Sequence, residues 1–258
     1  MRIAFFDSGI GGISVLHEAM KQLPHEDFLY FADTLHVPYG TKSKEEVLAF
    51  VKECVEAIHK EEVKALVIAC NTATSIAITE LRKLYDMPII GMEPAVKPAL
   101  EMNRSSGKRV LVFATPLTLK ESKYRDLVSR IDDTGMVDSL PLPELVEYCE
   151  KFQVEGQSII AYFQGKLSEY DLSSYGTVVL GCTHYPFYRR ILRTILPAHI
   201  QIVDGSAGTV NRLIQLLEHR GQLRGEGRGD LKFMCSSHDA AYIQKLERAL
   251  HLFQEVGV

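Results

Sequence analysis

Residues 65–74 read ALVIACNTAT: an apolar run stops at Cys70, and polar residues follow it. Residues 177–186, TVVLGCTHYP, repeat the arrangement around Cys182. In each stretch, aliphatic residues typical of a buried strand lead to a small residue, a cysteine and then residues that cap helices. The repetition predicts two similar strand–turn–helix units, each with a thiol at the carboxyl end of its strand.

Short apolar runs alternate with segments of helical period along the rest of the chain, which predicts an α/β fold with mainly parallel sheets. Helices are predicted after the capping box Ser43–Glu46, after both cysteines, with Pro186 in the first turn of the second, and at Asp239–Phe253. The strands are predicted at Arg2–Phe6, Phe28–Ala32, Ala65–Ala69, Ile89–Gly91, Val110–Ala114, Met136–Leu140, Val178–Gly181 and Gln201–Val203.

The chain carries an internal duplication. RIAFFDS from Arg2 resembles RVLVFAT from Arg109, an offset of 109 − 2 = 107, and the two cysteines differ by 182 − 70 = 112. Similar offsets for two strand-end motifs predict two pseudo-symmetric α/β domains with the active site in the cleft between them. We place the first domain at residues 1–96 plus 208–258 and the second at residues 97–207.

Composition narrows the class of protein. A chain of 258 residues can bury a sizeable core, and a net charge of −4 offers no general attraction to nucleic acid or anionic membranes, so neither is predicted as a partner. Five cysteines, an odd number without a C-x-x-C pair, argue against a disulfide framework. No run approaches the roughly 18 apolar residues of a membrane span. The sequence predicts a cytoplasmic protein.

Polar residues follow several predicted strands. Because ligands of parallel α/β sheets bind beyond the carboxyl ends of the strands, near helix N-termini, these residues predict a site for a carboxylate ligand, such as an amino acid. They are Asp7-Ser8, Asp33, Cys70-Asn71-Thr72, Thr115 and Cys182-Thr183-His184.

Two thiols suit one reaction in particular. Inverting a stereocentre by proton transfer needs a base on one face of the carbon and an acid on the other, and a duplicated fold supplies such a pair. A thiol becomes an effective base only when its thiolate is favoured by a helix dipole or a polar partner. Asp7 and His184 are the natural partners, one for each thiol.

Simpler interpretations remain open. A cysteine after a buried strand is often a small hydrophobe, and Asn71, Thr72 and Thr183 could serve only as helix caps. Cys54 and Cys149 lack matching neighbours and are interpreted as packing residues. The spacing Cys235-Ser-Ser-His238 lacks a second ligand pair, so no metal site is predicted.

The stretch FDSGIGG at Phe6–Gly12 is a glycine-rich turn after the first strand, which is also typical of dinucleotide-binding folds. Ser14, however, stands where the third glycine of that fingerprint belongs, and Asp7 would place a negative charge at the pyrophosphate. No nucleotide cofactor is therefore predicted.

Four motifs together resemble a known family: FDSGIGG at Phe6–Gly12, VPYG at Val37–Gly40, ACNTA at Ala69–Ala73 and GCTHYP at Gly181–Pro186. They are similar to those of bacterial glutamate racemases, in the same order from Met1 to about Ser206. The resemblance implies a cofactor-independent isomerase that interconverts L- and D-glutamate and supplies D-glutamate for peptidoglycan, the cell-wall polymer. Similar aspartate racemases carry Glu at the position of His184, which favours glutamate as the substrate.

The resemblance also implies roles for individual residues. Cys70 and Cys182 would face opposite sides of the substrate Cα, with Asp7 assisting Cys70 and His184 assisting Cys182. Glu147, in the segment PELVE, would support His184. The implied substrate-binding residues are Asp7, Ser8, Pro38, Tyr39, Gly40, Asn71, Thr72, Thr115, Thr118, Thr183 and His184.

Two departures from the family pattern affect the loops and not the thiols. His36 stands where many relatives have Arg, and Leu140–Pro143 replaces a more usual Cys-Pro-Leu-Phe. An aspartate racemase, or a racemase of another amino acid, is one alternative function, and a non-catalytic protein that binds a small acid is the other. Glutamate is the predicted small-molecule partner, and a homodimer is a further possibility.

Overall fold

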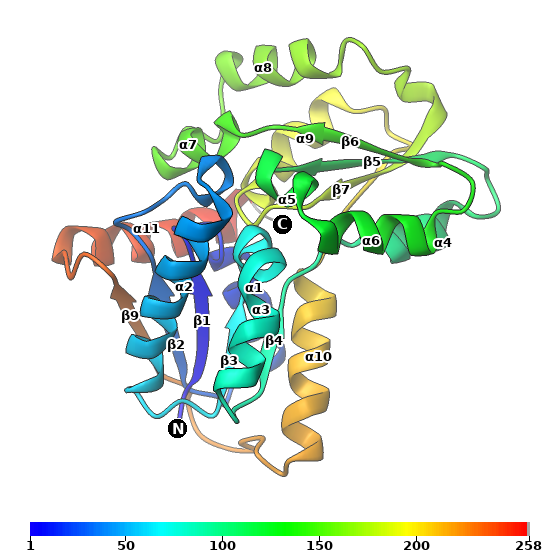
Figure 1. The fold of residues 1–258 in the computed structure, drawn as a ribbon. Helices are drawn as coiled ribbons and strands as arrows, with labels where there is room; N and C mark the ends of the chain where they lie inside the picture. Colours follow the sequence, from blue (N-terminus) through cyan, green and yellow to red (C-terminus); the bar gives the residue numbers. More distant parts are fainter. Residues whose placement is uncertain (257–258) are drawn as a thin grey trace.

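The computed structural model describes residues 1–256, which build two sheets whose strand pairs are all parallel (Figure 1). The first sheet has the order β4-β3-β1-β2-β9, and its strands are β1 (Ile3–Asp7), β2 (Phe28–Ala32), β3 (Ala65–Ile68), β4 (Ile89–Gly91) and β9 (Leu231–Cys235). The second sheet has the order β6-β5-β7-β8, and its strands are β5 (Arg109–Ala114), β6 (Val137–Pro141), β7 (Tyr175–Leu180) and β8 (Gln201–Asp204). The predicted α/β fold with two parallel sheets is confirmed.

Helices cover both sheets. Those associated with the first sheet are α1 (Ile13–Gln22), α2 (Lys44–His59), α3 (Asn71–Leu84), α10 (Ser206–His219) and α11 (Ala240–Val256). The others are α4 (Val96–Asn103), α5 (Pro116–Lys120), α6 (Ser122–Ile131), α7 (Glu144–Glu150), α8 (Gln157–Leu167) and α9 (Arg189–Ile195). Short 3₁₀ turns lie at η1 (Tyr39–Thr41), η2 (Leu172–Ser174) and η3 (Tyr185–Tyr188). No helix among residues 1–256 combines the length and the apolar character needed to cross a membrane.

All eight predicted strands are present, and Phe28–Ala32 and Ile89–Gly91 have the predicted bounds. The capping box of α2 is also confirmed, because the Ser43 side chain accepts from the Glu46 N–H and the Glu46 carboxylate accepts from the Ser43 N–H. The prediction missed β9, an edge strand whose residues are mostly only half-buried. Pro186 lies in the first helical turn after Cys182, as predicted, but that turn is the 3₁₀ helix η3, which continues directly into α9.

One apolar core joins the two halves of the molecule. It includes Phe5 of β1, Phe113 of β5, Leu180 of β7 and Phe253 of α11, all buried. In Figure 1, β1 rises from the N-terminus at the bottom, and the second sheet lies across the upper part of the view. The carboxyl ends of the first sheet therefore point toward the second sheet (Figure 1), and the predicted site residues Asp7 and Thr183 meet at this junction.

A buried ion pair fastens the opposite end of the first sheet. The Lys64 ammonium, just before β3, donates to the Glu26 carboxylate at 2.5 Å and to the Gln222 carbonyl at 2.7 Å. Glu26 also accepts the Arg224 N–H at 2.8 Å. The pair is almost fully shielded, with side-chain exposures of 9% and 1%. It ties the segment between α10 and β9 to the base of the sheet.

Replacing Lys64 with Met should lower the free energy of unfolding by about 3 kcal/mol, because it leaves the Glu26 carboxylate buried without its cation. Urea denaturation followed by circular dichroism measures this loss. Lys60→Met is the matched control, since Lys60 pairs with Glu56 at the surface and should change the midpoint little. Equal midpoints for the two variants would show that the buried pair contributes nothing.

Candidate active site

Asp7, the last residue of β1, joins the two sheets at their carboxyl ends. Its Oδ2 accepts a hydrogen bond from the Thr183 hydroxyl at 3.0 Å, and its Oδ1 accepts the Gly9 N–H at 3.0 Å. The Ser14 hydroxyl donates to the Thr183 carbonyl at 3.2 Å and adds a second link. Burial raises the pKa of Asp7, while the charge of His184 and the two hydrogen bonds oppose that rise.

Cys70 lies at the N-terminus of α3, directly beyond β3. Its Sγ accepts the Ala73 N–H at 3.4 Å and lies 4.0 Å from the Ser8 hydroxyl. Burial, followed by the charge of Asp7, raises the pKa of the Cys70 thiol, although the Ala73 N–H opposes the rise. A positively charged group bound nearby would counter both causes and favour the thiolate.

Cys182, His184 and Glu150 form a line of groups beyond β7. The Cys182 Sγ lies 3.8 Å from His184 Nδ1, and His184 Nε2 lies 2.9 Å from Glu150 Oε1. Burial alone lowers the pKa of His184, but the contacts with Cys182 and Glu150 outweigh burial and raise the pKa to about 10. Burial alone raises the pKa of Glu150, yet His184 and Lys245 hold it at about 2. The imidazolium–carboxylate pair is therefore charged near neutral pH, and it can stabilise a thiolate at Cys182.

The prediction that Glu147 supports His184 was wrong. Glu147 lies one helical turn earlier on α7 and is exposed to solvent, whereas Glu150 points inward to His184. The sequence motif identified the correct helix. The choice between its carboxylates depends on which face of α7 is buried, and the motif does not contain that information.

The glycine-rich turn after β1 lets the chain approach His184 closely. A Cβ on Gly11 would lie only 2.4 Å from His184 Nδ1, so a side chain cannot be accommodated there. The nearby Ile10 N–H donates to Glu150 Oε1 at 2.8 Å. The turn therefore contacts His184 and Glu150 directly.

Three hydroxyl groups gather between α3 and α5. They belong to Thr72, Thr115 and Thr118, which are all buried, and any two of the three hydroxyl oxygens are 3.0 Å apart. Gly40 approaches the same cluster, because a Cβ there would lie 2.6 Å from the Thr115 Cβ. Asn71 beside them donates to the Met92 carbonyl at 3.3 Å, while its buried Oδ1 has no hydrogen-bond partner among residues 1–256.

The VPYG loop (Val37–Gly40) is supported by contacts with Asp33 and Phe50. The Val37–Pro38 peptide bond is cis, and the Tyr39 hydroxyl donates to Asp33 Oδ2 at 2.5 Å. Asp33 also contacts His36 Nδ1 at 2.9 Å, and the His36 ring stacks on Phe50 with centroids 3.6 Å apart. The Tyr39 hydroxyl is thus engaged by Asp33, so the Tyr39 side chain supports the loop.

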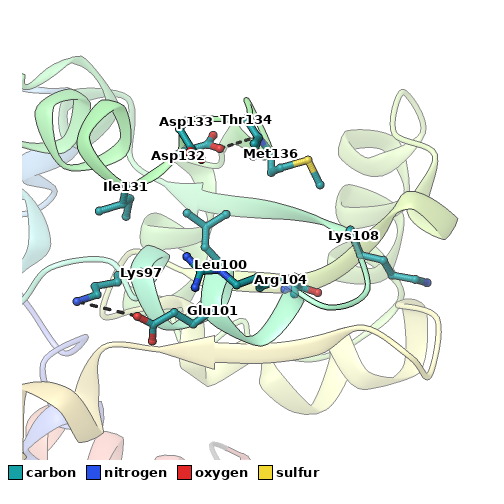
Figure 2. A pocket seen from close by; sticks show the side chains of 12 residues that line it. Lys97, Leu100, Glu101, Arg104, Lys108, Ile131, Asp132, Asp133, Thr134 and Met136 are labelled. Atoms are coloured by element: carbon teal, nitrogen blue, oxygen red, sulfur yellow. Dashed lines mark hydrogen bonds and ion pairs between the residues drawn. The ribbon is translucent and has the colours of Figure 1, made fainter.

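The site is closed. Cys70 and Cys182 are only 6% and 7% exposed, and Asp7, Ser8, Thr183 and His184 are also buried. A cavity of 670 Å³ lies elsewhere, between α4 and the segment from α6 to β6 (Figure 2). Its lining contains none of the predicted site residues.

No group of three or more His, Cys, Asp or Glu side chains in residues 1–256 is arranged to hold a metal ion. The Cys235 thiol contacts the Ser237 hydroxyl at 3.4 Å and the Asp239 carbonyl at 3.7 Å. These contacts suit a packing residue in the turn between β9 and α11.

Replacing Glu150 with Gln should lower the pKa of His184 from about 10, because the variant lacks the anion that stabilises the imidazolium. The imidazolium is then lost at lower pH. NMR of ¹⁵N-labelled histidine follows this titration. Glu147→Gln is the matched control on the same helix and should leave the titration unchanged; an equal fall in both variants would contradict the assignment of Glu150.

Comparison with known proteins agrees with this geometry. The family model for Asp/Glu/hydantoin racemases matches residues 12–213. A glutamate racemase from Halothermothrix orenii is 51% identical over 257 residues, covering 99% of this chain and 100% of that protein. Glutamate racemase 2 of Bacillus subtilis is 49% identical over 258 residues, covering 99% and 97%. The crystal structure of the Francisella tularensis glutamate racemase in complex with D-glutamate has a TM-score of 0.84 at 28% identity, covering 97% and 93%. The chain therefore belongs to the Asp/Glu/hydantoin racemase family, in its glutamate racemase branch.

Proposed function

We propose that this glutamate racemase moves the α-proton of glutamate between Cys70 and Cys182. The observation that carries the proposal is the equivalent placement of the two thiols. Each is buried just beyond an interior strand of its own sheet, β3 for Cys70 and β7 for Cys182. The Thr183 hydroxyl, beside Cys182, donates at 3.0 Å to Asp7 at the end of β1, the strand next to β3. A carbon held between the two sheets would have one sulfur on each face.

The reaction needs one thiolate and one thiol. The thiolate takes the α-proton as the Cα–H bond breaks, and the electron pair passes into the adjacent carboxylate. The opposite thiol then gives its proton to the other face of Cα. Each turnover leaves the two sulfurs with exchanged protonation states, which is the state that the other enantiomer requires.

The two thiols have different electrostatic surroundings. Beside Cys182, the charged pair of His184 and Glu150 stabilises a thiolate. Beside Cys70, burial and the negative charge of Asp7 favour the thiol over the thiolate. The positive α-ammonium group of the bound substrate would oppose both and favour the thiolate. Substrate binding would thereby activate Cys70.

The hydroxyl cluster of Thr72, Thr115 and Thr118 supplies donors for a substrate carboxylate at the N-terminus of α3. The Asn71 Oδ1, which lacks a partner in residues 1–256, is an acceptor for the ammonium group. Closure of the site strengthens these interactions and stabilises the developing carbanion, because little water competes for the charges. Ser8, Pro38, Tyr39 and Gly40 complete the proposed pocket wall.

The product also defines a cellular role, and we propose the supply of D-glutamate for peptidoglycan.

We also propose that the chain divides into two domains, residues 1–96 plus 208–258 and residues 97–207. Helices α10 and α11 pack against α1, which covers the first sheet, and α4 packs against β5 and β7 of the second sheet. The cytoplasmic location and a homodimer remain predictions.

Cys70→Ala and Cys182→Ala should each reduce racemisation by a factor of about 10⁴ or more, because each variant lacks a proton-transfer group. Circular dichroism measures the change of optical activity from each enantiomer. L- and D-glutamate have equal free energies in solution, so kcat/KM must fall equally in both directions. Cys54→Ala, which alters a buried thiol of α2, is the matched control and should keep the activity.

The same reactions in D₂O test the two-base step. Product of inverted configuration should carry deuterium at Cα, whereas early recovered substrate should keep its protium, because the incoming proton comes from the opposite thiol. NMR of the separated enantiomers measures both. Near-full activity in either Cys→Ala variant, or inverted product that retains the original proton, would rule out the two-thiol mechanism.

A further inference from the structure

Glu150 is held from three separate parts of the chain. Its Oε1 accepts hydrogen bonds from the Ile10 N–H at 2.8 Å and from His184 Nε2 at 2.9 Å. Its Oε2 accepts from the Tyr242 hydroxyl at 2.7 Å and from the Lys245 ammonium at 2.6 Å. One carboxylate oxygen thus serves the active site, and the other is held by α11, whose residues were not among the predicted site residues.

Helix α11 packs closely on the rest of the protein, which fixes the positions of Tyr242 and Lys245. Leu246, Ala249 and Phe253 are buried, and the Phe253 ring packs on Phe187 of η3 with centroids 4.9 Å apart. The Lys245 ammonium also lies 4.4 Å from the centroid of the Tyr242 ring, which restricts the lysine side chain. The helix therefore presents a fixed cation and a fixed hydroxyl to Glu150.

We propose that Lys245 and Tyr242 are positioning residues for the racemase reaction: they hold Glu150 against His184, and Lys245 sets the pH range in which the His184 imidazolium assists Cys182. This inference rests on the proposed function of the Cys182–His184–Glu150 line. Neither residue contacts the thiols, so both act through Glu150.

The charges around Glu150 give the direction of the effect. The titratable groups that interact with Glu150 are Asp7, Tyr30, Cys149, His184, Tyr242 and Lys245. Only His184 and Lys245 among them carry positive charge. Removing the Lys245 charge leaves the cluster more negative, so His184 holds its proton to higher pH.

Lys245→Met should therefore lower kcat/KM at neutral pH by roughly three- to tenfold and move both limbs of its pH profile toward higher pH by about half a unit to one unit. The Lys245 side chain is 23% exposed, so solvent screening weakens the effect of its charge and keeps the displacement small. Lys245→Arg keeps the charge and should restore both the rate and the profile. Tyr242→Phe removes a neutral donor and should lower the rate with a smaller displacement of the profile.

Arg248→Met is the matched control, since it removes a positive charge from the same helix at a residue that lies over the Phe152 ring. It should leave the profile in place. Urea midpoints of all variants separate loss of folding from loss of function. An unmoved or lowered profile in Lys245→Met would overturn the inference, as would failure of Lys245→Arg to restore it.

NMR titration of His184 in the substrate-free protein gives a second readout, independent of turnover. Lys245→Met should raise the pKa of His184 above that of the unmodified protein, and Arg248→Met should not. If the unmodified protein did not racemise glutamate, the proposed function would fail, and this titration would still decide the role of Lys245. An unchanged titration in Lys245→Met would overturn the inference whatever the activity.

Discussion

Parallel strands bring their carboxyl ends to one edge of a sheet, and both sheets of this protein are parallel throughout. Each edge collects helix N-termini together with the polar residues that follow the strands. The proposed reaction centre lies where two such edges meet. A hydrogen bond of 3.0 Å from the Thr183 hydroxyl to the Asp7 carboxylate links the two edges. Neither edge alone could present groups to both faces of one carbon.

Much of the fold could be predicted because the central strands are wholly buried, so their apolar runs are uninterrupted. Phe28–Ala32 is an example, and its bounds were predicted correctly. Strand β9 was missed, and its edge position alone does not explain this, because the equally exposed edge strands β6 and β8 were predicted. Leu231–Cys235 follows a glycine-rich loop, and no strand was predicted beyond that loop.

The site was predictable where chemistry and local sequence coincide. Cys70 and Cys182 were identified because each combines a strand end with capping residues. Glu150 was missed in favour of Glu147, because two carboxylates three residues apart on a helix point only about 60° apart, and burial decides between them. Lys245 could not be found from sequence, since its contact with Glu150 joins helices that are distant along the chain.

The closed state of the site has a consequence for the chemical lifetime of the protein. All five cysteines are free thiols and buried, including Cys70 and Cys182 of the proposed reaction centre. Oxidants attack thiolates that they can reach, and in the closed protein peroxide has as little access to Cys70 and Cys182 as bulk water has. Substrate entry requires the same barrier to open. Oxidation of these two sulfurs is therefore limited by how often the site opens to solvent.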